Sequence, residues 1–568
     1  MMMGRGLYGW LFGFVVLGNS FIGAGSKDNP CIQPTKIDQH HAAVSYFVHP
    51  LLGSDLNDGT SKEKPFKTFL PLEKIKFNPG DEIILAANQR YTGSLQLVNQ
   101  EGSREKPILV RSVGWKEGEP PMPALIDFKG LANGILIQDV SFIHISNIRL
   151  TGNGFDQANE KSDMRCGILV NSNNRKEMTG IRLDHIFIRD VYFENAGFIR
   201  NVSEVHSANG TQQYGWGIRV ISRQEDRTIR DIQISDCEIT DVSHTGIKFT
   251  GNKKNIRDVK ILRNAVKYTG GPGMQMSEVQ AVYVADNVVD HSGSNNESRK
   301  WGRGSGIWTW GSAGVLIEKN KFLYANGPGD SDGAHIDYNC ENIIIQYNFS
   351  AYNAGGFCEI LGNNYNCIYR YNISVNDGHR VKGENGAFQE GKTLWLSGFQ
   401  GEKQKRKGPV NTYIYNNTIY TDHSLYPKLA FDNTSRDVLI ANNIFYLVHP
   451  FQWVLGDQYK PDVKTNRVIE NMQLKHNLFL DKSGWPSQMA IYGSQSFFGD
   501  PHFKIPGGLD CQDYTPLNVD IICKKGIRVP GMKIETGDFP FDIAMRKDIL
   551  GNPIPDQPSI GAIEPVVD

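Results

Sequence analysis

The chain has 568 residues, of which 59 are glycine, and a formal net charge of −1 at pH 7. Because a near-neutral chain has no general attraction for polyanions, its balance of charge argues against nucleic acid as a partner. The length alone suggests about three or four domains, but a solenoid can be this long as one domain since its core grows along a single axis.

The N-terminus has the pattern of a secretory signal peptide. Arg5 precedes an apolar stretch from Leu7 to Ile22, and small residues follow it. This stretch is short and rich in glycine for a membrane helix, and no later segment is long enough to cross a bilayer. We therefore predict that residues 1–25 are a signal peptide and that the mature protein is secreted or periplasmic.

The two ends of the mature chain differ from its middle. Motifs at Tyr46–Pro50 and Gly53–Thr60 resemble the opening motif of many secreted bacterial β-helix proteins, and the segment from Gly499 to Glu564 resembles their closing segment. Such terminal pieces cover the end edges of a solenoid. We predict an N-terminal cap and first coils at 27–130, regular coils at 131–480, and C-terminal coils with a closing segment at 481–568.

One asparagine recurs in the middle of the chain, each time after an alternating apolar stretch. Short separations of 23, 24 and 26 residues suggest a repeat, and longer separations suggest loop insertions. The alternation and the Gly and Asn punctuation indicate strands, and an asparagine at one turn can stack its amide on the next coil. The recurring residues are Asn264, Asn287, Asn320, Asn348, Asn372, Asn417, Asn443 and Asn477.

This pattern predicts an all-β fold, a right-handed parallel β-helix of the pectate-lyase-like kind, as a single domain with terminal caps. A β-sandwich is the alternative, but it would not keep one asparagine in register over eight units. The eight cysteines are too widely spread for a small-domain disulfide framework, and no spacing typical of a zinc site is present. Cys511 and Cys523 could bridge, whereas Cys340, Cys358 and Cys367 could either pair or pack in the core.

Two carboxylates suggest the chemistry. Asp337 and Glu359 are 22 residues apart, which is about one repeat. If each repeat is one turn of the solenoid, the two lie one strand spacing apart, roughly 4.7–4.9 Å. Counted back from Asn348 and Asn372, they share one column of one sheet if the second coil has a two-residue insertion. Carboxylates at roughly 5–5.5 Å are typical of retaining glycosidases.

The same column should continue on both sides. Thr309 is expected to precede Asp337, flanked by Trp308 and Trp310, whose rings could cover the apolar side of a sugar. Glu390 is expected to stack after Glu359. Like charges stacked at strand spacing repel one another, so this arrangement favours a functional site over a solvated sheet face.

Other polar residues surround the predicted pair. His335 shares the face of Asp337 and could bond a sugar hydroxyl, tune the pair, or be structural. Asp330 and Asp332 lie on the loop before this strand; they could bind substrate or Ca²⁺, although turn chemistry also explains them. No cofactor other than Ca²⁺ is suggested.

The segments Gly306–Trp310 and Phe357–Gly362, together with Asp337, resemble the active-site coils of the β-helical β-xylosidases of glycoside hydrolase family 120. The resemblance covers about sixty residues and implies that Asp337 is the nucleophile and Glu359 the acid/base. In that family the aspartate directly follows the tryptophan strand, whereas here the two are on different coils. A β-helical relative that acts on another sugar, such as an α-L-fucosidase, fits as well.

Together these features predict an exported, retaining and exo-acting glycoside hydrolase for oligosaccharides or polysaccharide side chains. Asp337 would attack the anomeric carbon while Glu359 protonates the leaving oxygen and then activates water. Neighbouring carboxylates raise one pKa of such a pair, which suits the acid.

Two other classes stay open. A polysaccharide lyase on this fold would abstract a proton with a basic residue, for which Lys248, Arg380 and Lys382 are candidates. Lys248 has no arginine partner one coil later, and Arg380 and Lys382 could instead bind an acidic sugar beside the carboxylates. The third class is a non-catalytic carbohydrate-binding surface protein, for which no titratable pair is needed.

Overall fold

The structure is a computed structural model that describes residues 42–118, 121–155, 164–207, 210–457, 469–486, 495–532, 534 and 539–565. The predicted signal peptide lies outside these residues. Residues 43–568 form one compact unit. In the described part of the chain, no helix has the length and apolar character needed to span a membrane.

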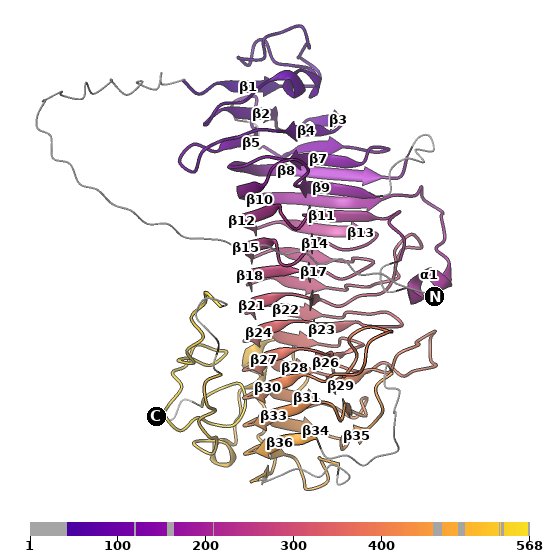
Figure 1. Ribbon diagram of the computed structural model, residues 1–568, viewed down its shortest axis with the longest axis vertical. Coiled ribbons are helices and arrows are strands. Elements are labelled where there is room, and N and C mark those ends of the chain that lie inside the picture. Colours follow the sequence, from indigo (N-terminus) through magenta and orange to yellow (C-terminus); the bar gives the residue numbers. More distant parts are fainter. Residues whose placement is uncertain are drawn as a thin grey trace, which may run out of the picture. The chain divides into compact units, whose positions relative to one another are not determined.

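The strands form three parallel rows that run along a solenoid (Figure 1). Each coil passes through the first, the second and the third row in turn, and equivalent strands of neighbouring coils pair in parallel. The long strands β8 and β10 belong to both the first and the second row, so these two rows make one 26-stranded sheet. The third row is a separate 12-stranded sheet.

The first row contains β1 (Ser45–Val48), β2 (Glu82–Ala86), β5 (Ile108–Val113), β8 (Ile143–Asn153), β10 (Glu177–Tyr192), β12 (Thr228–Ser235), β15 (Ile256–Leu262), β18 (Val279–Ala285), β21 (Ala313–Glu318), β24 (Glu341–Gln346), β27 (Tyr365–Arg370), β30 (Val410–Tyr415), β33 (Arg436–Ala441) and β36 (Glu470–Lys475). Besides β8 and β10, the second row contains β3 (Arg90–Thr92), β6 (Ala124–Asp127), β13 (Glu238–Val242), β16 (Ala265–Lys267), β19 (Val288–Asp290), β22 (Lys321–Leu323), β25 (Phe349–Ala351), β28 (Ile373–Val375), β31 (Thr418–Thr421), β34 (Ile444–Leu447), β37 (Leu478–Phe479) and β38 (Phe497–Phe498).

The third row contains β4 (Leu95–Val98), β7 (Asn133–Gln138), β9 (Arg165–Asn171), β11 (Gly215–Ile221), β14 (Ile247–Thr250), β17 (Met274–Ser277), β20 (Ile307–Trp310), β23 (Asp332–Ile336), β26 (Gly356–Ile360), β29 (Lys392–Leu396), β32 (Lys428–Phe431) and β35 (Gln452–Trp453). The helices are short: α1 (Val202–His206) and the 3-10 turns η1 (Leu70–Lys74), η2 (Cys511–Tyr514) and η3 (Val519–Ile521).

Alternation along each strand separates the core from the outer face. In β26, Cys358 and Ile360 join the continuous apolar core that runs from Val48 to Phe479, so Glu359 between them points outward. The parallel rows and the unbroken core confirm the predicted parallel β-helix. Each fully buried aliphatic side chain in this core contributes about 1.5–3 kcal/mol to stability.

The predicted asparagine ladder is present. The backbone N–H and the side-chain amide of Asn348 both donate to the amide oxygen of Asn372, at 2.9 and 3.0 Å. The same hydrogen bond between side-chain amides links each ladder asparagine to the next, from Asn264 to Asn477. The residue before each of them has a left-handed backbone, as at Tyr347 with φ of 55°. These residues make the corner between the first and second rows.

The closing segment lies along the side of the solenoid as well as near its end. Tyr514 and Ile560 pack against outward-facing apolar residues of the second row, including Phe349 and Tyr420. The side-chain amide of Asn416 donates to the carbonyl of Ser559 at 2.9 Å. In Figure 1 this yellow segment runs beside the coils that contain β24 to β36. It therefore covers an apolar flank that the coils alone would expose.

Seven cysteines fall within the described residues, and all seven are free thiols. The possible bridge between Cys511 and Cys523 is therefore not formed. Cys340, Cys358 and Cys367 are buried and belong to the apolar core, so of the two alternatives for them the structure has the unpaired one.

Candidate active site

His335, and not Asp337, lies directly beside Glu359. The register of β23 and β26 pairs His335 with Glu359, and Ile336 with Ile360. The prediction that Asp337 and Glu359 share a column is therefore wrong. Asn348 follows His335 by the same 13 residues that separate Glu359 from Asn372, so these coils have equal lengths and need no insertion. Thr309 likewise pairs with Ile336 and is fully buried, outside the predicted column.

Asp337 still faces the same side of the third row. It follows the end of β23, two residues after His335, which makes it a diagonal neighbour of Glu359 at roughly 7–8 Å. Its backbone N–H donates to the carbonyl of Thr309 at 2.8 Å, which continues the sheet, and its carboxylate accepts from the N–H of Tyr338 at 2.8 Å. Burial raises the pKa of Asp337 to about 6.

Three polar side chains form a buried cluster beside Asp337. Asp332, His335 and Glu359 are 2, 2 and 4% exposed, and one ligand atom from each lies within 4.8 Å of the other two. The Nδ1 of His335 lies 3.6 Å from a carboxylate oxygen of Asp332 and 3.0 Å from the hydroxyl of Ser305. The sequence placed these residues near one another but did not predict this contact.

The cluster contains one ionised pair and one neutral acid. Burial, reinforced by the negative charge of Asp332, raises the pKa of Glu359 well above its usual value and favours its protonated form. Burial acts in the same direction on Asp332, but His335 outweighs it and the pKa of Asp332 is lowered. Burial opposes the charge on His335, yet Asp332 outweighs it and the pKa of His335 is raised. These directions favour an Asp332–His335 ion pair beside a protonated Glu359.

Asp330 adds a fourth acid to the site. Its carboxylate is 16% exposed and forms an ion pair with Arg303 at 3.0 Å. Its charge contributes to the raised pKa of both Asp337 and Glu359, although burial is the larger cause in each case. Asp330 and Ser331 both have left-handed backbones, with φ of 47° and 75°. Such conformations in residues other than glycine are costly and cluster at functional sites.

The predicted Ca²⁺ ligands Asp330 and Asp332 take different places in this arrangement, Asp332 in the buried cluster and Asp330 beside Arg303. Ca²⁺ takes about 6–8 oxygen ligands, whereas the candidate cluster offers two carboxylates and an imidazole. A ligating histidine must be neutral, and the pKa of His335 is raised. Asp330 is engaged by Arg303 instead. On this chemistry we expect the cluster to serve in proton transfer, and Ca²⁺ binding stays a prediction.

Tryptophans flank the cluster on both sides. Trp308 pairs with His335 in the register, and their rings are 5.3 Å apart at the centroids. Trp395 pairs with Glu359 on the other side and carries the Lys392 ammonium 3.8 Å from its ring. The half-buried Trp310 continues the sheet next to Asp337. Trp395 was missed in the sequence because an inserted loop separates it from the repeat; its position between Leu394 and Leu396 was the available signal.

The other predicted binding residues lie around this centre in different roles. Glu390 precedes β29 and pairs with Lys428 at 2.6 Å, so the prediction that it continues the column is wrong; Trp395 has that place. Lys382 pairs with Asp457 at 2.7 Å. The guanidinium of Arg380 is buried and donates to three backbone carbonyls of the surrounding loops, those of Gly327, Asp330 and Gln389. Arg380 therefore positions the loop that carries Asp330.

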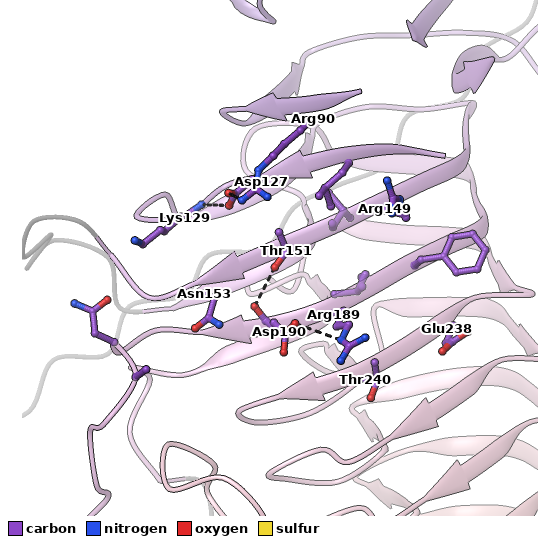
Figure 2. A pocket seen from close by; sticks show the side chains of 16 residues that line it. Arg90, Asp127, Lys129, Arg149, Thr151, Asn153, Arg189, Asp190, Glu238 and Thr240 are labelled. Carbon is purple, nitrogen blue, oxygen red and sulfur yellow. Dashed lines mark hydrogen bonds and ion pairs between the residues drawn. The ribbon is translucent and has the colours of Figure 1, made fainter. Parts of the chain in front are cut away.

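A hollow of about 890 Å³ lies elsewhere, on the second row (Figure 2). It is lined by residues of β3, β6, β8, β10 and β13. Two of its three carboxylates face arginines: Asp127 pairs with Arg90, and Asp190 with Arg189 at 3.3 Å. The buried acid cluster of the third row is the stronger candidate for a catalytic centre because its carboxyl groups have strongly shifted pKa values.

The sequence matches a family model described as a right handed beta helix region over residues 216–387, a range that contains the acid cluster. A curated relative is the lacto-N-biosidase of Bifidobacterium longum subsp. longum, which is 22% identical over 624 aligned residues. The alignment covers 92% of this chain and 36% of that protein. The chain thus spans about a third of the length of this relative.

Two solved structures are similar to this chain to different degrees. The native GH136 lacto-N-biosidase from Eubacterium ramulus has a TM-score of 0.51 at 18% sequence identity, over 72% of this chain and 68% of that one. The complex of XylC with xylose has a TM-score of 0.43 at 12% identity, over 92% and 98% of the two chains. The parallel rows, the family model and the first of these structures together identify the fold of this chain as a right-handed parallel β-helix.

Proposed function

We propose that this chain is an exported glycoside hydrolase whose catalytic carboxyl groups are Asp337 and Glu359. The carrying observation is a neutral, buried Glu359 on the same sheet face as a more accessible Asp337, with tryptophans on adjacent strands. A glycosidase needs one protonated and one ionised carboxyl group at the scissile bond. The similarity to two lacto-N-biosidases supports hydrolysis of a glycosidic bond in an oligosaccharide.

The two carboxyl groups take different roles because their environments differ. Glu359 retains its proton and delivers it to the leaving oxygen. Asp337, with a pKa of about 6, is ionised at neutral pH and stabilises or attacks the anomeric carbon. The ion pair of Asp332 with His335 keeps a negative charge beside Glu359, which sustains its high pKa. Trp308 and Trp310 supply apolar surface for the sugar rings.

The stereochemical course we propose is retention. Inverting enzymes hold their carboxyl groups roughly 6.5–9.5 Å apart so that a water molecule fits between them and the sugar. The diagonal spacing of roughly 7–8 Å between Asp337 and Glu359 lies in this range, so retention requires the two side chains to turn toward one another across the sheet face. Asp337 is the more exposed of the two carboxyl groups, so a sugar can approach it directly, and on this ground we propose attack by Asp337. Exo action is part of this proposal, since Gly456, in the loop after β35, lies against Trp395, and Lys382 and Lys392 hold the neighbouring Asp457.

The test is hydrolysis of aryl xylosides, fucosides, arabinosides and galacturonides, and of lacto-N-oligosaccharides, by the wild-type protein and four variants. We expect Asp337→Asn to lose roughly 10²–10⁴-fold or more in kcat on all cleaved substrates. Glu359→Gln should lose activity on natural leaving groups but keep more of it on activated aryl groups, which need no protonation. Glu390→Gln, outside the column, is the matched control and should keep its rate.

The outcomes separate the alternatives. If Asp330→Asn shows the leaving-group dependence and Glu359→Gln does not, Asp330 is the proton donor. An inverted first product, seen by NMR of the anomeric proton, would mean that Asp337 activates water. An unsaturated uronate product would replace the hydrolase with a lyase. Binding without turnover, unchanged in both carboxyl variants, would indicate a carbohydrate-binding protein.

A further inference from the structure

The outward column that holds His335 and Glu359 continues toward the N-terminal coils, where it carries basic side chains in place of acidic ones. The register places Trp308 beside Gln275, Gln275 beside Lys248, and Lys248 beside Arg219. Lys248 on β14 and Glu359 on β26 are separated by three intervening strands, which amounts to roughly 19 Å at the usual strand spacing. One line of side chains therefore joins two cations to the acid cluster.

Both cations are buried, and the part of the chain that the structure describes places no carboxylate in an ion pair with either. Arg219, Lys248 and Gln275 are 5, 7 and 5% exposed. Within the described residues, Lys248 forms no hydrogen bond or ion pair, and no carboxylate pairs with either cation. The Nε of Arg219 and the Oε1 of Gln275 are buried without hydrogen-bond partners. The remaining contacts of Arg219 are weak for a guanidinium: its Nη1 lies 3.3 Å from the amide oxygen of Gln212 and 3.0 Å from the sulfur of Met164.

This arrangement is unfavourable for a protein that binds nothing there. Buried charges are normally paired, and like charges on neighbouring strands repel. Burial, with the charge of Arg219 as the second cause, lowers the pKa of Lys248 to about 7. The ring of Trp216 lies 4.5 Å from the guanidinium of Arg219 and holds it in place without neutralising it. An anionic group placed between the two cations would remove the repulsion and satisfy the free donors.

We propose that Arg219 and Lys248 form a binding subsite for an anionic substituent of the glycan, a carboxylate or a sulfate. The planar guanidinium and the flexible ammonium match the oxygens of either group. Gln275 and Trp308 lie between this subsite and the acids. The amide oxygen of Gln275 can accept a hydrogen bond from a sugar hydroxyl, and the indole of Trp308 can cover a sugar ring. The position of the cleaved bond, several sugar units away, rests on the function proposed above; the anion binding itself does not.

The first test measures binding by calorimetry to the Glu359→Gln protein, which stops turnover. The probes are an oligogalacturonide, its carboxyl-reduced neutral counterpart, and a sulfated galactose oligosaccharide of the same length. We expect at least one anionic probe to bind roughly tenfold more tightly than the neutral one. Adding Lys248→Gln or Arg219→Gln should abolish this preference. Lys260→Gln removes an exposed lysine of β15 and is the matched control.

The second test needs no glycan and checks that the variants fold. Inorganic sulfate and acetate should raise the Tm of the wild-type protein, and of Lys260→Gln, more than that of Lys248→Gln. Equal affinity for anionic and neutral probes, or a preference that survives both substitutions, would overturn the subsite. The subsite would also be overturned if the wild-type protein converts the oligogalacturonide to an unsaturated product and Lys248→Gln does not. That result would make Lys248 part of a lyase centre. If hydrolysis fails on every substrate while the Lys248-dependent preference persists, the hydrolase proposal falls and the subsite stands.

Discussion

Asp337 is a carboxyl group for which folding and function have opposite requirements. Its pKa is raised from 3.8 to about 6 mainly by burial, so the folded chain resists its ionisation, whereas the proposed reaction needs the ionised form. For an acid whose folded pKa is raised, the stability is full below the unfolded pKa and is lost as pH rises through the folded value. The loss from this one group reaches at most about 3 kcal/mol above pH 6.

We therefore expect Asp337→Asn to raise the thermal stability at neutral pH while it abolishes activity. The Tm of the variant should exceed that of the wild-type protein at pH 7.5, and the two should converge below about pH 3, where Asp337 is protonated in both the folded and the unfolded state. Calorimetric unfolding at the two pH values measures this. Asp286→Asn, in an exposed turn, is the control, and a Tm difference for Asp337→Asn that is equal at both pH values would contradict the explanation.

At the scale of elements, the asparagine ladder holds the corners of successive coils in register. Asn348 is buried, and its side-chain amide donates to the carbonyls of Ile317 and Gln346. The same amide accepts a hydrogen bond from Asn320 and donates one to Asn372. In a low-dielectric interior such chained bonds support one another. The ladder runs beside the coils of the acid cluster, so it also fixes how β23 and β26 align.

Replacing Asn348 by alanine should destabilise the protein by about 3–5 kcal/mol, because several buried donors and acceptors lose partners at about 1–3 kcal/mol each. Chemical denaturation measures the change. Asn477→Ala, at the end of the ladder, is the matched comparison: Asn477 accepts from Asn443 but has no further ladder asparagine to which it donates. A cost at Asn477 as large as that at Asn348 would show that the interior ladder bonds add little.

At the scale of the whole molecule, the closing segment stabilises the coils that it covers. A solenoid is stabilised mainly by contacts between neighbouring repeats, so damage in one region need not spread to the other end. Tyr514 is fully buried between Phe349, Tyr420 and Phe503, and it fastens the segment to the second row.

We expect Tyr514→Ala to cost about 3–5 kcal/mol locally, as for other buried aromatic truncations. Hydrogen exchange followed by mass spectrometry should show faster exchange in β25, β31 and β34, while β10 keeps the exchange rate of the wild-type protein. Uniformly faster exchange along the solenoid would mean that the chain unfolds as one cooperative unit.

The fold could be predicted because its signals repeat. The alternating apolar residues recur along the solenoid and the ladder asparagine recurs in the coils from Asn264 to Asn477, and both follow from local geometry: a two-sided strand and a tight corner. The outward face of His335, Asp337 and Glu359 was also within reach, because alternation fixes the face of a strand residue once its core neighbours are known.

The neighbour of Glu359 was decided only by the tertiary structure. A shift of two residues keeps every side chain on its face, so the apolar pattern cannot distinguish His335 from Asp337 as the partner. The choice depends on how each turn closes, including left-handed corners at residues such as Tyr347 that carry no glycine signal. The contact of Arg219 with Lys248 is decided in the same way. The sequence by itself thus determined the β-helical coil, the asparagine ladder and the sheet face on which the acidic residues lie. The tertiary structure determined which charged side chains are neighbours, because the conformation of each turn sets the register between strands.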